Sequence, residues 1–422
     1  MRNLAPYLPP ALQKRRVRIY TAGHAVSVLG GWFQQIALSW LVYRLTGSMF
    51  LLGLTGFLLQ IPYLLLGPFT GTLVDRVSRF WMLVVTDLIL AGLALTLAAM
   101  AFMHVEDIRA YLLIATLIGI ASAFELPARQ SLFVALVDDD RTLLPSVIAL
   151  SAVIYNAGRM VGPALAGGLL LLLPEAWCFL INALSFAGIL GALFAMKLPE
   201  QMAPPPVRAP DVKPTSFAES VTFLNTLPAV RYLLPMTASL GFFGVTYVQQ
   251  MPSIADTFFG GSSGMVGFLM SGAGVGALSA AFFLSMQRGT ARQAKLVTIA
   301  PFITGIGLIA FALSRSLLLS YILLALISCS IMLTTASTNV LVQQSVPDAW
   351  RGRAIGLYSM SFQGTAPVGN LLAGALASWI GLSATLALNG TAILIAAVLL
   401  RWRLADNPGA LTDTARPREA GE

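Results

Sequence analysis

The chain has 422 residues, of which 57% are hydrophobic and only 10% are charged. Soluble domains carry about 25% charged residues, so this composition excludes an ordinary soluble protein. The formal net charge of +8 does not indicate nucleic-acid binding, because the basic residues lie mainly between long apolar runs.

Apolar runs recur along almost the whole chain, and runs of about 20 residues cross the roughly 30 Å hydrocarbon core of a bilayer as helices. The alternation typical of membrane barrel strands is absent. We therefore predict an all-α polytopic membrane protein. Twelve spans are predicted, at residues 18–45, 49–71, 80–103, 109–136, 143–172, 175–197, 228–256, 263–286, 294–313, 317–342, 353–380 and 382–401.

The spans form two predicted six-helix halves, because one Pro-rich polar stretch divides the chain near its midpoint. The predicted parts are an N-terminal segment (1–17), a first half (18–197), a central loop (198–227), a second half (228–403) and a tail (404–422). We also expect a surface helix near 215–226. The two halves are similar in sequence at one place, since "GPALAGGL" at 162–169 resembles "APVGNLLAGAL" at 366–376. Tandem halves of this kind are typical of transporters.

The basic residues orient the spans, because Lys and Arg gather on the cytoplasmic side of membrane proteins. One alternate set of loops holds only Arg44, Arg109 and Arg315, whereas the other set and the two ends of the chain hold most of the rest. We predict that both termini lie in the cytoplasm.

Span five contains an unusual cation. Arg159 is the only Lys or Arg between Leu143 and Leu173, and this stretch has no Asp or Glu. A charge at the bilayer centre costs about 2.5–3.5 kcal/mol on insertion scales, so it usually faces a cavity or a partner. Asn156 lies three residues earlier and shares the helical face of Arg159, where we expect it to orient the guanidinium or bind substrate.

Two acidic residues lie deep inside predicted spans, Asp87 in span three and Glu125 in span four. We predict that Glu125 approaches Arg159 across a cavity of the first half and forms a proton or substrate site. A purely structural ion pair, or side chains that face different directions, are the alternatives. Burial favours the protonated form of a carboxyl and a nearby arginine favours the ionised form, so Glu125 is a candidate proton carrier. Asp87 is either part of this site or structurally paired with a neighbouring basic residue.

Small residues around Arg159 have a mechanical interpretation. Gly158, Gly162 and Ala166 recur every four residues, and such strips let helices approach closely. Pro163 removes a backbone hydrogen bond and permits a bend. We predict that Gly158, Gly162, Pro163 and Gly167 form a hinge and seal, although ordinary small-residue packing is the alternative.

The turn after span two reads "GTLVDRVSRFWML" (71–83) and resembles the signature loop of the major facilitator superfamily. Ser78 replaces a glycine of that motif and Phe80 replaces a basic residue. The matching residues are Gly71, Leu73, Asp75, Arg76 and Arg79. The resemblance covers essentially the whole chain and implies the major facilitator fold.

Three further stretches resemble the exporting members of the superfamily. "GRMVGPALAGG" (158–168) is similar to the antiporter motif, and residues 127–137 and 345–377 are similar to the transmembrane secretion effectors, a branch of drug and siderophore exporters. This resemblance implies proton-driven export of a small organic molecule.

The same resemblance implies a cytoplasmic latch. Asp75, Arg76 and Arg79 would meet the inner end of span eleven and stabilise the outward-open state, because a carboxylate is favoured near a helix N-terminus. We expect Arg129, near the inner end of span four, to belong to this gate. The candidate partners near span eleven are Asp348, Arg351 and Arg353.

The predicted function is proton-coupled export of small, partly lipophilic organic molecules through a bacterial-type plasma membrane, by a chain that works as a monomer. Import of a metabolite and lipid transport are the alternatives. A membrane-embedded enzyme or receptor is disfavoured, because only two His are present, with no metal-ligand cluster and no Gly-rich nucleotide loop. We predict no cofactor, no metal and no nucleic-acid partner, and His24 is expected to be a passive residue at the membrane interface.

Overall fold

A computed structural model describes residues 10–74, 77–137, 140–196, 217–287, 289–347, 350–407 and 411. The chain divides into two compact units. The first contains residues 1–47, 58–209 and 261–271, and the second contains residues 48–57, 210–260 and 272–422. Each unit therefore includes a short piece from the other half of the sequence.

Six long helices occupy the first half of the sequence. They are α1 (Arg15–Thr46), α2 (Met49–Val74), α3 (Arg79–Phe102), α4 (Ile108–Leu136), α5 (Leu144–Leu172) and α6 (Glu175–Ala195). Local signals set their ends: Gly47 terminates α1 in the left-handed conformation (φ 59°), and the Asp107 side chain caps α4 by accepting a 2.9 Å hydrogen bond from the Arg109 backbone N–H.

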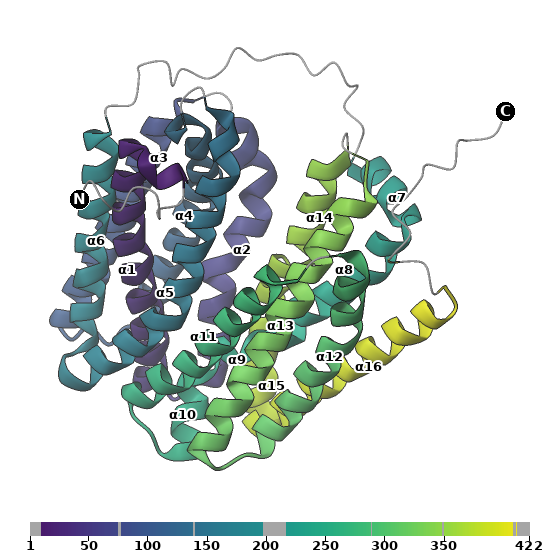
Figure 1. Cartoon of the computed structure of the whole chain (residues 1–422). Helices are drawn as coiled ribbons and strands as arrows, with labels where there is room; N and C mark the ends of the chain where they lie inside the picture. The colour runs from purple at the N-terminus through teal and green to yellow at the C-terminus, as the bar shows by residue number, and fades with distance from the viewer. Residues whose placement is uncertain are drawn as a thin grey trace. The chain divides into compact units, whose positions relative to one another are not determined.

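Helix α1 is central to the first unit, where it packs against α5 on one side and α6 on the other (Figure 1). Helix α3 packs against α4 and α6. At the end of α1, Arg44 forms a 2.7 Å ion pair with Glu175 at the start of α6. This packing brings the polar residues of α1, α3, α4 and α5 into one interior.

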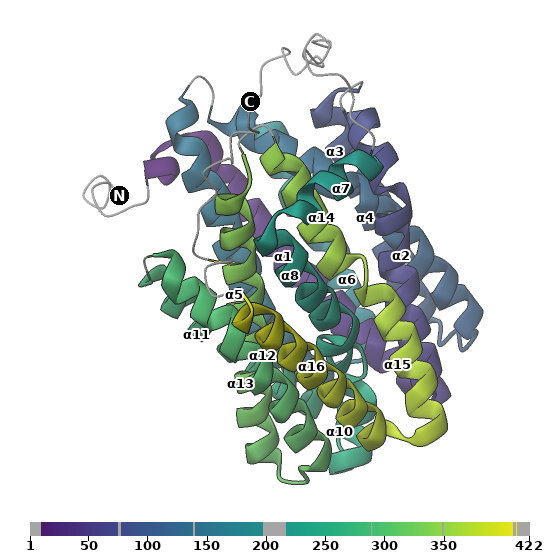
Figure 2. The ribbon, with the colours of Figure 1, turned by 90° about the vertical axis from the view of Figure 1, so that its right-hand side faces the viewer.

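The second half of the sequence is also helical but is more interrupted. Its elements are α7 (Phe217–Thr226), α8 (Pro228–Ser239), the π-helical turn η4 (Leu240–Gly244), α9 (Thr246–Gln249), α10 (Met251–Phe259), α11 (Ser263–Ser285), α12 (Thr290–Leu313), α13 (Leu317–Ser345), α14 (Arg351–Gln363), α15 (Ala366–Ile380) and α16 (Leu382–Ala405). In the second unit α12 lies beside α13 and α16 (Figure 2).

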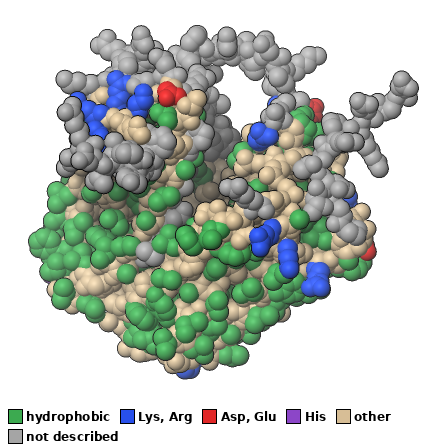
Figure 3. All heavy atoms as spheres, in the orientation of Figure 1, with side chains coloured by type: hydrophobic (Ala, Val, Ile, Leu, Met, Phe, Trp, Pro, Cys, Tyr) green, Lys and Arg blue, Asp and Glu red, His purple; other side chains and the backbone are tan. Residues whose placement is uncertain are grey.

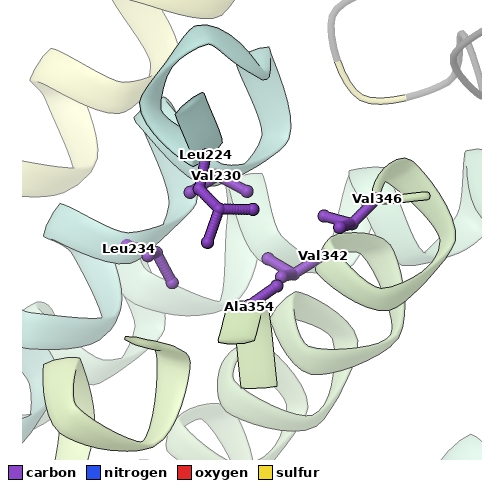
Figure 4. Packing of buried hydrophobic residues seen from close by; sticks show 6 residues of the cluster. All are labelled: Leu224, Val230, Leu234, Val342, Val346 and Ala354. Atoms are coloured by element: carbon purple, nitrogen blue, oxygen red, sulfur yellow. The ribbon is translucent and has the colours of Figure 1, made fainter. Parts of the chain in front are cut away.

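Helix α7, the helix expected near 215–226, is anchored by apolar packing. Leu224 joins a cluster with residues of α8, α13 and α14 (Figure 4). Phe223 packs against Trp350 in a tilted arrangement, with ring centroids 4.3 Å apart. The members of the cluster are Leu224, Val230, Leu234, Val342, Val346 and Ala354.

Nine helices among the described residues are long and apolar enough to cross a membrane. The predicted spans 228–256 and 353–380 are absent from that set because each is broken, the first at η4 and the second at residues 364–365. Helix α5 contributes two shorter apolar stretches, at residues 146–155 and 161–172.

Large hydrophobic side chains are exposed along the long helices, for example Leu65, Phe282 and Trp379. Hydrophobic side chains are spread widely over the visible face, with Lys and Arg in a few groups (Figure 3). An exterior of this kind suits a hydrocarbon environment, where water is not the solvent.

Candidate functional site

A buried polar cluster lies in the first unit and is built from four helices. Its members are His24 of α1, Asp87 of α3, Glu125 and Arg129 of α4, and Ser151 of α5.

Arg129 is the centre of the polar cluster. Its side chain donates a hydrogen bond to Glu125, one turn earlier on α4, and lies 3.6 Å from an oxygen of Asp87. Its Nη1 lies 2.8 Å from Nδ1 of His24. Arg129 is 7% exposed, so its charge is neutralised inside the protein and not by solvent.

The contacts of His24 define its protonation state. A guanidinium can only donate, so Nδ1 of His24 accepts from Arg129 and the ring proton is on Nε2. Nε2–H then donates to the Ser151 hydroxyl at 3.3 Å. Tyr20 stacks on the ring, with centroids 5.4 Å apart. His24 is therefore neutral here, and its protonation would place a second cation against Arg129.

Asp87 is the least satisfied member of the cluster. It is fully buried, and neither carboxyl oxygen has a hydrogen-bond partner among the described residues. The 3.6 Å approach to Arg129 is an electrostatic contact only. A buried carboxylate without hydrogen bonds is costly, so this position favours a bound proton or a donor from a ligand.

The members of the cluster share one depth. His24, Asp87 and Ser151 each lie roughly two turns after their helices begin, and Arg129 lies roughly two turns before α4 ends. By the predicted topology, these four helix ends face the cytoplasm. Two turns correspond to roughly 11 Å, which is the distance of the cluster from these helix ends along the helix axes.

The ionic balance of the cluster suits ion exchange. It contains one permanent cation, Arg129, and two carboxyl groups, Asp87 and Glu125. Because His24 is neutral in this arrangement, one negative charge remains when both carboxyls are ionised. A proton or a cationic group on the ligand would balance it.

Arg129 lies in this interior, whereas we predicted from the sequence that it belongs to the cytoplasmic latch. The structure places Asp87 beside a basic residue, which is one of the two arrangements expected for it. Sequence reasoning missed the contact of His24 with Arg129, in which the histidine ring is buried (6% exposed). Tyr20 and Ser151 were also missed, because a stacked ring and a serine give no signal of their own.

The predicted Glu125–Arg159 pair remains a prediction. Arg159 and Asn156 belong to α5, but their side chains lie outside the described residues. Arg159 follows Ser151 by roughly two turns of α5, or about 12 Å. Glu125 itself is bonded to Arg129.

Span five packs closely through its glycines. A Cβ on Gly162 would lie 2.6 Å from Cβ of Trp32 on α1. A Cβ on Gly167 would lie 2.5 Å from Cα of Gly267 on α11. Only glycine permits these approaches. Gly158 also faces α1, and Pro163 lies inside α5.

A second glycine crossing occurs in the second unit. A Cβ on Gly53 of α2 would lie 3.0 Å from Cα of Gly374 on α15, and a Cβ on Gly374 would lie 2.6 Å from the Met49 carbonyl oxygen. Gly374 aligns with Gly167 when the similar stretches 162–169 and 366–376 of the two sequence halves are compared. The two crossings, α5 with α11 and α2 with α15, are therefore equivalent positions in the two sequence halves.

The two interrupted spans cross at their breaks. The Thr365 hydroxyl donates to the Ala238 carbonyl at 3.1 Å, and a Cβ on Gly241 would lie 2.5 Å from that hydroxyl oxygen. Nearby, Asn389 of α16 donates to Thr246 at 2.9 Å. Broken helices in transporters expose backbone polar groups at the substrate site, so this crossing is a second candidate contact region.

The predicted latch lies largely outside the described residues, which do not include Asp75, Arg76, Asp348 or the side chain of Arg79. Arg351 is exposed and Arg353 half-buried in the first turn of α14, where Arg353 lies 4.6 Å from the ring centroid of Trp350. Among the residues that the structure does describe, no three or more His, Cys, Asp and Glu are grouped to hold a metal ion.

The family model described as "Transmembrane secretion effector" matches residues 5–415. The protein is thus a multi-pass membrane transporter, not an enzyme, and it belongs to the transmembrane secretion effector family of the major facilitator superfamily. This agrees with the predicted fold class and with the expected branch.

Individual relatives align with most of the chain at low sequence identity. The staphyloferrin A transporter of Staphylococcus aureus is 24% identical, covering 86% of this chain and 89% of the relative. Macrolide efflux protein A of Streptococcus pyogenes is 24% identical, covering 91% and 95%. A bacterial homologue of the human lysosomal transporter Spinster, solved inward-facing and unoccupied, has a TM-score of 0.71 at 15% identity, covering 97% of this chain and 100% of that one.

Proposed function

We propose that this protein is a proton-coupled secondary transporter that exports small, partly lipophilic organic molecules by alternating access. The observation that carries the proposal is the buried polar cluster, in which two carboxyl groups share one arginine.

Asp87 is the group we assign to proton exchange. Glu125 is held by its hydrogen bond to Arg129, whereas Asp87 has no hydrogen bond among the described residues. A proton on Asp87 balances the cluster, and its release leaves a negative charge that attracts Arg129 or a cationic ligand. This assignment modifies the expectation that Glu125 is the principal carrier.

Alternating access would use the glycine crossings. Gly167–Gly267 and Gly53–Gly374 bring helix backbones into contact at equivalent places in the two sequence halves. Contacts of this kind lack long side chains that must be repacked, so they can open and re-form as the halves move. Asn156 and Arg159 would line the substrate path on α5, and Pro163 would permit α5 to bend.

The relatives support the direction and the substrate class. One is named as a macrolide efflux protein and another as a staphyloferrin A transporter. We propose further that both termini are cytoplasmic, that the membrane is a bacterial plasma membrane, that a monomer suffices, and that Asp75, Arg76 and Arg79 latch the cytoplasmic side against Asp348, Arg351 and Arg353.

Inverted membrane vesicles with an acidic lumen test the proposal. Candidate macrolides, dyes and siderophores are added outside, and lumenal pH and substrate uptake are recorded together. An exporter will accumulate substrate in the lumen while the lumen becomes more alkaline. Accumulation without any dependence on the pH gradient would exclude proton coupling, and accumulation only in right-side-out vesicles would indicate import.

A further inference from the structure

A second polar site lies in the second unit, far along the sequence from the buried polar cluster. A cavity of about 330 Å³ is formed by the end of α11, the turn after it, the start of α12 and the exposed face of α13. Among the described residues, its polar side chains are those of three glutamines, Gln287, Gln293 and Gln344. We call this cavity the glutamine groove.

Two acceptors in the glutamine groove are unused. The Oε1 atoms of Gln287 and Gln293 are buried and have no hydrogen-bond partner among the described residues. Gln293 is only 8% exposed. A buried carbonyl oxygen left unpaired costs about 1–3 kcal/mol, so the groove is stabilised by a ligand that brings N–H or O–H donors.

The surroundings of the groove define the rest of the ligand. Arg292, which precedes Gln293 in the sequence, is exposed near the start of α12, and the first turn of that helix has no acidic residue. This end of a helix also attracts anions. Val340 lines the groove and is 37% exposed, and Met286, which precedes Gln287 in the sequence, is 67% exposed. The ligand therefore combines a hydrogen-bond donor, an adjacent anion and an apolar part.

We propose that the glutamine groove binds the headgroup of a membrane phospholipid that carries a primary ammonium, as in phosphatidylethanolamine. The ammonium donates to Oε1 of Gln287 and Gln293, and the phosphate lies toward the adjacent Arg292. The acyl chains lie over the exposed apolar side chains. By the predicted topology the lipid belongs to the cytoplasmic leaflet. This lipid site is independent of the proposed transport cycle.

Lipid binding to the purified protein tests the site directly, without a transported substrate. Native mass spectrometry is used with lipids of matched acyl chains in which the amine carries zero, one, two or three methyl groups. We expect retention to fall as N–H donors are removed, by about tenfold between phosphatidylethanolamine and phosphatidylcholine. Gln293→Met and Gln287→Met will abolish this preference.

Gln343→Met is the matched control, since Gln343 is adjacent to Gln344 but donates to Asn339 at 2.7 Å instead of lining the groove. It will keep the preference. If the methionine variants do not fold, Gln293→Glu is decisive: its carboxylate will strengthen the preference for the primary ammonium.

Three results would overturn the lipid assignment. Equal retention of all four headgroups would exclude an ammonium contact. Equal retention of phosphatidylglycerol would reduce the site to phosphate binding at Arg292. Displacement of the lipid by free phosphoethanolamine at the same concentration would identify a soluble ligand instead of a lipid.

Discussion

Among single residues, Asp87 and Arg129 are the most informative, because they decide the charge of the protein interior. Asp87 is fully buried without a hydrogen bond among the described residues, and Arg129 contacts two carboxyl groups and a neutral histidine. The sequence predicted that the two buried acids matter, since charges inside spans are costly. It did not reveal that Asp87 and His24 meet Arg129, because those contacts depend on how α1, α3 and α4 pack.

Asp87→Asn tests the proton carrier. Asparagine keeps the size and approximates the protonated form, so the protein will fold and bind substrate, but gradient-driven export will fall by at least about tenfold. Uptake in inverted vesicles measures the effect. Glu106→Gln, which removes an exposed carboxylate from the α3–α4 turn, is the control and will transport normally. Full gradient-driven export by Asp87→Asn would refute the assignment.

Arg129→Met tests whether the cluster is a coupled ionic unit. Removing the cation leaves two buried carboxyl groups without a partner, and we expect a loss of about 3–5 kcal/mol in the free energy of unfolding. Thermal unfolding in detergent will show it. The triple variant Arg129→Met, Asp87→Asn and Glu125→Gln will recover most of that loss, because no charge remains to be neutralised. A triple variant as unstable as the single one would mean that Arg129 acts by packing alone.

Among the helices, α5 best connects sequence to mechanism. The spacing of its glycines predicted close helix packing. In the structure Gly162 lies against Trp32, and Gly167 lies against Gly267. The sequence did not predict the interruptions of the seventh and eleventh spans, at Leu240–Gly244 and at residues 364–365. Apolar character runs through Leu240–Gly244, and the π-helical turn there follows from contacts with Phe362 and Thr365, which lie more than 100 residues away.

Gly167→Ala tests the glycine crossing. The new Cβ would meet the Gly267 backbone at 2.5 Å, which cannot move as a side chain can. We expect export to fall several-fold and thermal stability to fall by about 1–3 kcal/mol. Gly168→Ala is the control, because nothing lies within 4 Å of its added Cβ, and it will behave as the wild type. Equal behaviour of the two variants would show that close packing at Gly167 is unimportant.

For the whole molecule, the fold class and the branch of the superfamily were predictable, because apolar runs recur along the chain and the family resemblance extends over residues 5–415. The orientation in the membrane rests on the bias of basic residues. In a variant with Cys178 and Cys329 replaced by serine, a cysteine introduced by Glu106→Cys will react with an impermeant thiol reagent from outside. One introduced by Asn407→Cys will react only after the membrane is opened. The reverse pattern would invert the topology.

The central claim, exchange of a proton for substrate at the buried polar cluster, is tested most directly by proton release from the purified protein. Substrate identified in the vesicle assay is added to detergent-solubilised protein in weakly buffered solution, and pH is recorded. The wild type will release protons on binding, and Asp87→Asn will bind substrate and release none. Substrate binding by the wild type without proton release, or equal release by Asp87→Asn, would contradict the account.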